Sequence, residues 1–318
     1  MQLMAADDNR RMHTDLATNG VVALTHRGVI RARGADAARF LHSQLTNDML
    51  QLDGSRAVLA GFCSAKGRLQ ASFVAWQGAA DEILLACAAD LLAPTLKRLS
   101  MFVLRAQCKL SDAGAELPLS GLAGDTAATL LGDAAVWERR EVASGTLVRL
   151  PDVQGVKRAL LAGSAPQGRP ALSLDRWRWL EVSSGVPTVE AATVDQFVPQ
   201  MVNFELIGGV DFRKGCYPGQ EVVARSQYRG TIKRRMFLFD VAAAAQAGQE
   251  LFHSADPGQP AGMVVNAAPS SDGGSRVLAE VKLAALEGGT LHLAAADGPR
   301  LERRELPYAV PLESATAA

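Results

Sequence analysis

A loop around a single cysteine carries the residues of this chain whose types and spacing are best suited to chemistry. Residues 213–221 read Arg-Lys-Gly-Cys-Tyr-Pro-Gly-Gln-Glu. Gly215 and Gly219 allow a tight turn and a close approach to the sulfur of Cys216, and the cation of Lys214 favours the reactive thiolate. The loop therefore predicts that Cys216 is a nucleophile, a redox-sensitive thiol or a transient ligand for a soft metal. The alternative is a surface turn with an inert cysteine.

A cationic stretch begins in this loop and continues beyond it. Its only acidic residue is Glu221, and its basic residues are Arg213, Lys214, Arg225, Arg229, Lys233, Arg234 and Arg235. The whole chain is neutral, with 33 basic and 33 acidic residues, so the stretch is a local feature and we expect no stable nucleic-acid binding. An anionic ligand tail or an acidic partner protein suits it. A solvated charged face is the alternative.

The composition is that of a globular protein with room for two or three compact units. The chain has 318 residues, of which 48% are hydrophobic and 21% charged. No apolar run is long enough to span a membrane, and the first residues lack the apolar core of a signal peptide, so we expect a cytoplasmic protein with free thiols. The cysteines and the five histidines show no ligand spacing, which predicts no stable metal or cluster.

The order of predicted elements indicates an α+β fold with largely antiparallel sheets. In the first part, apolar patterning predicts strands at 21–24, 28–32, 56–63, 69–76, 82–86 and 103–110, with helices capped by Asp36 and Asp90. The next part repeats the pattern, with strands at 119–121, 136–140, 146–150 and 159–161 and helices at 126–131 and 174–183. Short strands at 237–239, 249–252, 261–265 and 275–281 predict a small β-barrel or sandwich.

These patterns divide the chain into four segments. We expect a loose lead-in at 1–18 and a core at 19–235, made of about two subdomains with a break near 111–120. A C-terminal β-barrel follows at 236–311, and 312–318 is expected to be a frayed tail.

Four ordered blocks resemble one known family. They are Phe40-Leu41-His42-Ser43-Gln44-Leu45-Thr46-Asn47-Asp48, Gly61-Phe62-Cys63-Ser64-Ala65-Lys66-Gly67-Arg68, Gly185-Val186-Pro187 with 197–203, and the cysteine loop extended to Arg225. Together they resemble the YgfZ family of folate-binding proteins, which is related to the T-protein (aminomethyltransferase) of the glycine cleavage system. The resemblance implies a T-protein-like core of α/β subdomains around a central hole, followed by a C-terminal β-barrel.

The resemblance also implies a ligand, tetrahydrofolate with or without a polyglutamate tail, and a set of site residues. Cys216 and Lys214 are the expected chemical groups. The expected folate-binding residues are Gln44, Asn47, Trp177, Trp179, Phe197, Asn203, Tyr217, Arg229 and Lys233. Val186 is a further candidate for the apolar wall. Each of these side chains has an alternative place in the core or in a cap.

The chain departs from the transferase pattern at two places. T-proteins carry an Asp-Asp pair after the second block, whereas Gly67 to Ser72 include no carboxylate here. Ser183 stands at the position of the pterin-edge glutamate, and Glu181 lies two residues away. Loss of an acid–base carboxylate removes much of the rate enhancement of such an enzyme, so whether this chain is an enzyme stays open.

The leading hypothesis is therefore a tetrahydrofolate-binding accessory protein for assembly, repair or maintenance of iron–sulfur clusters in client enzymes, including tRNA-modifying enzymes. Its expected partners are folate and iron–sulfur client or assembly proteins. One alternative is a folate-dependent aminomethyltransferase or demethylase. The other is a client-docking module without chemistry.

Overall fold

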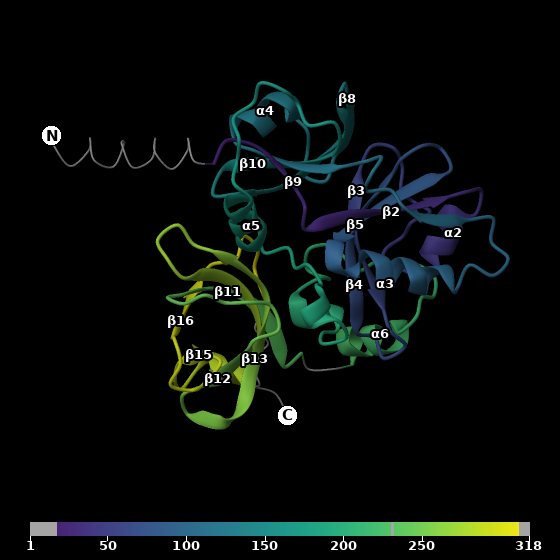
Figure 1. Cartoon of the computed structure of the whole chain (residues 1–318). Helices are drawn as coiled ribbons and strands as arrows, with labels where there is room; N and C mark the ends of the chain where they lie inside the picture. The colour runs from purple at the N-terminus through teal and green to yellow at the C-terminus, as the bar shows by residue number, and fades with distance from the viewer. Residues whose placement is uncertain (1–17, 230–231, 312–318) are drawn as a thin grey trace.

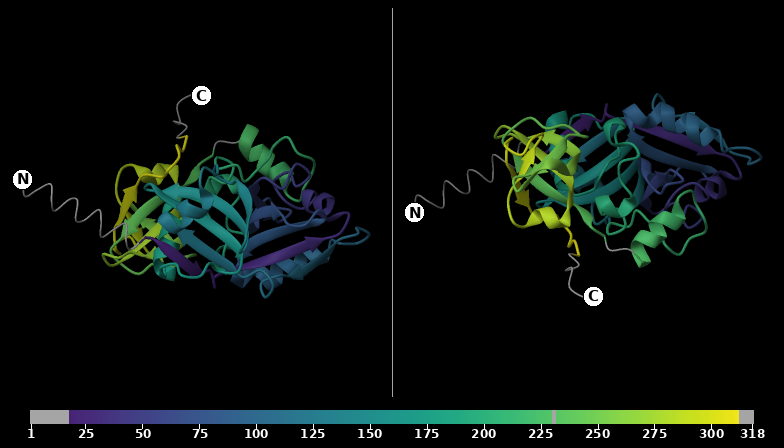
Figure 2. Two further views of the ribbon diagram at one scale, coloured as in Figure 1. Left: turned by 90° about the horizontal axis from the view of Figure 1, so that it is seen from above. Right: turned by 90° about the horizontal axis from the view of Figure 1, so that it is seen from below.

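The computed structural model describes residues 18–229 and 232–311 and arranges them as three antiparallel sheets around a common centre (Figure 1). Views from above and below place the C-terminal sheet at one end of the molecule and the first sheet at the other (Figure 2). The predicted α+β architecture is confirmed. The predicted tail at 312–318, and all but the last residue of the predicted lead-in at 1–18, lie outside the described residues.

The first sheet has the strand order β3-β4-β5-β2-β6. Its strands are β2 (Arg27–Arg33), β3 (Ala57–Cys63), β4 (Leu69–Gln77), β5 (Glu82–Ala88) and β6 (Lys109–Asp112), and its helices are α2 (Ala37–His42) and α3 (Ala89–Ser100). Phe40, Phe62, Phe73 and Leu85 are buried in the core between the sheet and these helices. Trp76, Leu84 and Ala86 of the same strands belong to another hydrophobic cluster, so both faces of this sheet are buried.

The second sheet has the order β1-β7-β10-β9-β8. Its strands are β1 (Gly20–Ala23), β7 (Leu119–Ala123), β8 (Arg139–Val142), β9 (Gly145–Val153) and β10 (Val156–Gly163), and it is accompanied by α4 (Asp125–Leu131) and α5 (Leu174–Ser183). The neighbours β1 and β2 belong to different sheets, since β1 pairs with β7 and β2 with β5 and β6. The turn between them therefore lies at the junction of two sheets.

The third sheet has the order β15-β12-β13-β14-β11-β16. Its strands are β11 (Arg234–Val241), β12 (Glu250–His253), β13 (Asp256–Pro269), β14 (Ser275–Lys282), β15 (Leu291–Leu293) and β16 (Leu301–Arg304), with a short helix, η3 (Leu283–Leu286). A bridge between His292 and Arg300 joins its two ends, as in a small barrel. The strands predicted at 237–239, 249–252, 261–265 and 275–281 overlap β11, β12, β13 and β14 in that order. The strands β15 and β16 were not predicted.

A long connection links the second sheet to the third. It contains the short helices η1 (Ala191–Thr193) and η2 (Pro199–Val202) and then α6 (Gln220–Tyr228). Its residues Phe197, Val202 and Phe204 are buried in a hydrophobic cluster that also includes residues of all three sheets. The connection therefore belongs to the shared core.

Two element predictions were wrong. The strand predicted at 103–110 is mostly irregular backbone in which Leu104 is exposed, and the strand begins only at Lys109. Asp90 does not cap α3, because the helix begins one residue earlier, at Ala89, and the carboxylate of Asp90 accepts a hydrogen bond from the backbone N–H of Ala191 (3.0 Å). The predicted cap of α2 does stand at Asp36, but its carboxylate binds the backbone N–H of Gln107 (2.8 Å).

Candidate functional site

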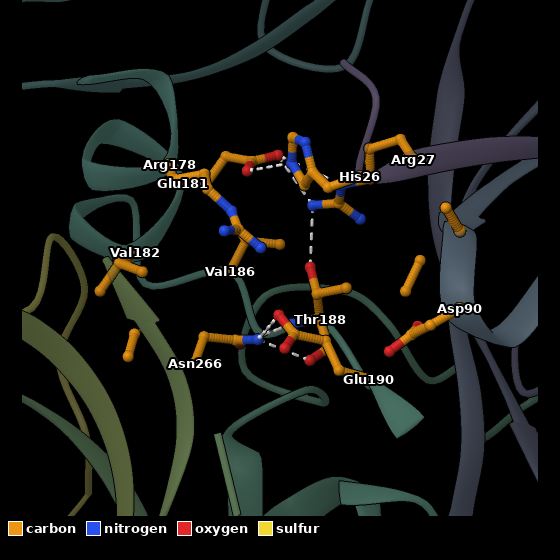
Figure 3. Close-up of a pocket in the computed structure, with 13 residues that line it drawn as sticks. His26, Arg27, Asp90, Arg178, Glu181, Val182, Val186, Thr188, Glu190 and Asn266 are labelled. Atoms are coloured by element: carbon orange, nitrogen blue, oxygen red, sulfur yellow. Dashed lines mark hydrogen bonds and ion pairs between the residues drawn. The ribbon is translucent and has the colours of Figure 1, made fainter. Parts of the chain in front are cut away.

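A pocket of about 260 Å³ lies where the three sheets meet (Figure 3). Five segments line it: the β1–β2 turn, the start of α3, α5, residues 186–190 and β13. The lining residues are His26, Arg27, Ala88, Ala89, Asp90, Arg178, Glu181, Val182, Val186, Thr188, Glu190, Asn266 and Ala267. Apolar side chains and a few convergent polar groups are typical of small-molecule sites.

Glu181 is the most strongly held charge in this pocket. Its carboxylate lies 2.7 Å from Nε2 of His26 and 2.9 Å from Nη2 of Arg27, which also donates to the hydroxyl of Thr188 (Figure 3). Burial alone would raise the pKa of Glu181, but Arg27, His26 and Arg158 together lower it far below its usual range. The carboxylate is therefore ionised at neutral pH.

A buried arginine lies behind this ion pair. Arg158 is buried, donates to the backbone carbonyl of Leu180, and places its guanidinium 5.2 Å from the ring centre of Trp177. Burial lowers the pKa of Arg158 to about 10, and the charge of Glu181 opposes that effect. Since it remains a cation at neutral pH, it helps to keep Glu181 ionised.

Glu190 is a second carboxylate with a different charge balance. Its Oε1 accepts a hydrogen bond from the side-chain amide of Asn266 (2.9 Å), which also pairs with the backbone N–H (2.9 Å) and carbonyl (2.8 Å) of Thr188. Burial raises the pKa of Glu190, against the opposing effects of Asn266, Arg178 and Arg27. The pocket thus combines one firmly ionised carboxylate with one that takes up a proton more readily, which is the arrangement that acid–base sites use.

The cysteine loop lies elsewhere, against the end of α2 and the β3–β4 turn. Cys216 is exposed, whereas Lys214 is only 7% exposed. The ammonium of Lys214 donates to the backbone carbonyls of His42 and Leu45 and lies 4.8 Å from the ring centre of Tyr217. Burial lowers the pKa of Lys214 to about 8, opposed by the negative charges of Asp48, Asp211 and Cys216. Lys214 thus ties the loop to the first sequence block.

Glycine makes the packing of this loop possible. Gly219 has φ of 78°, and a Cβ there would lie 2.3 Å from the carbonyl oxygen of Ser64. Gly67, with φ of 71°, faces it from the β3–β4 turn. The second and fourth sequence blocks therefore meet backbone to backbone.

The expected folate-binding residues do not come together at the pocket. Trp177 is buried under Arg158, and the ring of Trp179 lies between the guanidinium groups of Arg176 and Arg276, each 4.3 Å from its centre. Phe197 is buried and accepts a hydrogen bond from the backbone N–H of Leu69 (2.8 Å). Tyr217 is buried in the cysteine loop.

The expected polar groups bind other groups of the chain, and two of the three bind the backbone. The amide of Asn47 donates to the carbonyls of Leu59 and Gly208, both at 2.7 Å. The amide of Asn203 donates to the carbonyl of Met236 (2.7 Å), and the amide of Gln44 donates to the neighbouring Ser43 hydroxyl (3.0 Å).

The predicted cationic patch is smaller than its sequence suggests. Arg229 and Lys233 are exposed near the end of α6. Arg234 instead pairs with both oxygens of Glu280 at 2.8 Å, and the buried Arg235 pairs with Glu205. These two arginines are the first residues of β11, so their side chains point to opposite faces of the sheet, and each one pairs with a carboxylate there.

Most pocket residues were missed by sequence reasoning. Val186 was noticed because it belongs to the third sequence block. Glu181 was noticed because it lies two residues from Ser183, the position where the family resemblance places a glutamate. His26, Arg27, Glu190 and Asn266 come from separate segments, and no local motif marks them.

The described residues include neither a cluster of metal ligands nor a membrane-spanning helix. Nowhere in 18–229 or 232–311 do three or more His, Cys, Asp or Glu side chains gather in a way that could hold a metal ion. Within the same ranges, no helix has both the length and the apolar character needed to cross a membrane.

Comparisons with known proteins agree on one relationship. No protein-family model matches the chain. The chain is 32% identical over 272 residues to "tRNA-modifying protein YgfZ" of Edwardsiella ictaluri, covering 77% of this chain and 79% of that one. It is 30% identical over 232 residues to the protein of the same name from Colwellia psychrerythraea, covering 69% and 71%.

Among solved structures, the fold is similar to glycine cleavage system aminomethyltransferase T from Bartonella henselae. The TM-score is 0.73 at 16% identity, over 93% of this chain and 88% of that one. The predicted T-protein-like fold is therefore confirmed.

Proposed function

Because the chain belongs to the YgfZ family, we propose that it is a tetrahydrofolate-binding accessory protein in tRNA modification, which supports the assembly, repair or maintenance of iron–sulfur clusters in client enzymes. The name that its relatives carry supports the link to tRNA modification. The aminomethyltransferase fold supports a folate ligand. The cytoplasm, whose reducing poise keeps an exposed thiol such as Cys216 free, suits this role.

The central pocket is the observation that carries the proposal. A pterin ring is flat, apolar on its faces and rich in N–H donors along one edge. The ionised carboxylate of Glu181 would accept hydrogen bonds from that edge, and Val182 and Val186 would contact a ring face. Glu190 would hold or release a proton beside it. When bound, tetrahydrofolate would supply one-carbon acceptor chemistry.

The size of the pocket agrees with this use. Its volume of about 260 Å³ is just below the roughly 300–1,000 Å³ common for sites that enclose a whole drug-sized ligand. We expect the ring system to be enclosed and the glutamate tail to extend outside. Arg229 and Lys233 remain candidates for a polyglutamate tail because both are exposed and cationic.

The start of β4 favours an accessory protein over a transferase. The resemblance to T-proteins places carboxylates on this strand, but this chain has Gln70 and Ser72 there. The hydroxyl of Ser72 accepts a hydrogen bond from the backbone N–H of Val189 (2.9 Å). Cys216, outside the pocket, offers a separate thiol. We propose that it contacts client proteins or the soft metal that passes to them.

Calorimetric titration with tetrahydrofolate tests the proposal on the wild type, Val186→Phe and Cys216→Ala. Val186→Phe fills the pocket while leaving the ion pairs of Glu181 in place, so we expect at least a tenfold loss of affinity. Cys216→Ala should bind folate as the wild type does but fail to support a client tRNA-modifying enzyme in cells. Val136→Phe, at an exposed site outside the pocket, is the matched control.

The outcomes separate the parts of the proposal. Absence of saturable binding in the wild type would contradict folate binding. Equal affinity in Val186→Phe and Val136→Phe would contradict this pocket as the site. Full activity of Cys216→Ala in cells would contradict the role of the thiol.

A further inference from the structure

His42 and Asp48 form a fixed pair beside the cysteine loop. His42 is the last residue of α2, and its Nδ1 lies 2.9 Å from Oδ1 of Asp48. The two side chains are 16% and 21% exposed. The same carboxylate oxygen accepts backbone N–H groups of Leu50 (2.8 Å) and Gln51 (3.3 Å), so its position is held from three sides.

This pair determines which nitrogen of His42 is available. Burial alone would raise the pKa of Asp48, but the N–H of Leu50 and the nearby His42 lower it. An ionised carboxylate only accepts hydrogen bonds, so Nδ1 of His42 carries a hydrogen and Nε2 carries the lone pair. Within the described residues, Nε2 has no hydrogen-bond partner.

The free Nε2 faces the cysteine loop. A Cβ on Gly215 would lie 3.2 Å from Nε2, so the ring lies directly against the residue that precedes Cys216. Lys214, the residue before Gly215, donates a hydrogen bond from its ammonium group to the backbone carbonyl of His42. The loop is therefore fastened to His42 through its backbone, and the imidazole lies against Gly215, the residue next to the thiol in the chain.

We propose that Cys216, His42 and Asp48 form a thiol-activating site. Nε2 of His42 accepts the proton of the Cys216 Sγ, which leaves a thiolate beside an imidazolium, and Asp48 orients and stabilises that imidazolium. The thiolate then attacks one sulfur of a disulfide: a mixed disulfide with Cys216 forms as the original S–S bond breaks, and the departing thiolate takes the proton from the His42 imidazolium. When the thiolate instead binds a soft metal in transit, His42 returns the proton to Sγ as the metal leaves. The inference rests on the proposed function of Cys216 as the reactive thiol.

Other charged groups stand on the loop and on the segments packed against it. They are Lys66, Asp211, Arg213, Lys214 and Glu221, besides Asp48 itself. Lys214 has a favourable electrostatic interaction with Cys216, and the exposed Arg213 lies 4.0 Å from Asp211. Since all of them remain when only His42 is changed, a His42 variant isolates the contribution of the imidazole.

The first test measures the rate at which iodoacetamide alkylates Cys216 in the full chain between pH 5.5 and pH 10. Mass spectrometry of the Cys216 peptide separates this thiol from the buried Cys63 and Cys87 and the half-buried Cys108. We expect His42→Gln to slow alkylation at pH 7 about tenfold and to move the midpoint of the profile upward. Asp48→Asn should move it in the same direction by less.

The control is His292→Gln, which changes a half-buried histidine in β15, in the C-terminal sheet. It should leave the profile of Cys216 unchanged. A His42→Gln profile that matches the wild type would overturn the proposal.

A second measurement covers the case in which His42→Gln disturbs the loop. Proton NMR follows the titration of the His42 imidazole in the wild type and in Cys216→Ser. A neighbouring thiolate stabilises the imidazolium, so its removal should move the His42 midpoint downward. An unchanged midpoint would overturn the proposal. Neither readout depends on folate or on a client, so this site and the proposed function can fail separately.

Discussion

At the scale of the residue, the central pocket depends on two arginines and a histidine that keep one carboxylate charged. His26 and Arg27 contact Glu181 directly, and Arg158 acts on it from the buried side. A buried charge is tolerated only when it is paired and hydrogen-bonded. The same arrangement leaves Glu181 ready to accept hydrogen bonds from a ligand without first losing a proton.

We predict that Glu181→Gln lowers the free energy of unfolding by about 3 kcal/mol at pH 7, because it leaves the buried Arg158 and the half-buried Arg27 without their counter-charge. The folded pKa of Glu181 lies below the unfolded value of about 4.3. Its stabilisation is therefore complete above that value and is lost as the pH falls through the folded pKa. Urea denaturation from pH 7 to pH 3 should show the difference from the wild type shrinking below about pH 4.

Glu116→Gln is the control for this prediction. Glu116 is 67% exposed and pairs with Arg31 on the surface. We expect a change within about 0.5 kcal/mol at every pH. A pH-independent difference for Glu181→Gln would contradict the charged state assigned to Glu181.

The sequence could predict the cysteine loop but not the central pocket. The loop around Cys216 is contiguous, so one stretch of sequence contains its thiol, its cation and its glycines. The pocket is assembled from five segments, and its polar residues carry no mutual spacing. Asn47 and Asn203 looked like ligand-binding amides, but the chain uses them for unpaired backbone groups, a need that only the folded structure reveals.

At the scale of the element, the β3–β4 turn and the start of α6 act as one unit. Gly219 precedes α6 in a left-handed conformation, and its backbone lies against Gly67 and Ser64. The turn therefore provides the surface on which the cysteine loop is seated.

We predict that Gly219→Ala lowers the free energy of unfolding by about 2 kcal/mol more than Gly155→Ala does. Both glycines have similar positive φ, 78° and 83°, so each substitution carries the same backbone penalty of about 1 kcal/mol. A Cβ at Gly155 meets nothing within 4 Å, whereas one at Gly219 meets backbone. Chemical denaturation measures both, and equal losses would contradict the packing argument.

The periodicity of apolar residues predicted most helices and strands, but not the segments whose structure depends on pairing with another strand. The strands at 69–76 and 82–86 and the helix at 174–183 were found, because their apolar residues recur at the strand or helix period. The strand predicted at 103–110 begins with Val103 and Leu104, yet the part before Lys109 has no partner strand and Leu104 is exposed. Pairing, which decides that case, is a property of the sheet and not of the segment.

At the scale of the whole molecule, one hydrophobic cluster joins the three sheets. Trp76 of β4, Leu160 of β10 and Leu278 of β14 all belong to it. Asn266 of β13 adds polar links to residues 188–190. The sequence predicted the three groups of strands, but the assignment of β1 to the second sheet follows only from pairing between distant residues.

We predict that the wild type unfolds in a single thermal transition and that Asn266→Ala lowers the free energy of unfolding by about 3 kcal/mol. The substitution leaves the buried N–H and carbonyl of Thr188 unpaired. Scanning calorimetry measures both quantities. Asn19→Ala is the control, since it removes one hydrogen bond to the N–H of Thr126 and should cost about 1 kcal/mol. A second transition in the wild type would contradict the shared core.

The position of the pocket at the junction of three sheets has a consequence for the lifetime of the protein in a cell. A small molecule that binds there contacts all three parts at once and is released when any one of them detaches. At a concentration one hundred times its Kd, it stabilises the folded chain by about 2.7 kcal/mol. Degradation by proteases follows the population of opened molecules. Protein abundance would then rise and fall with the supply of that molecule.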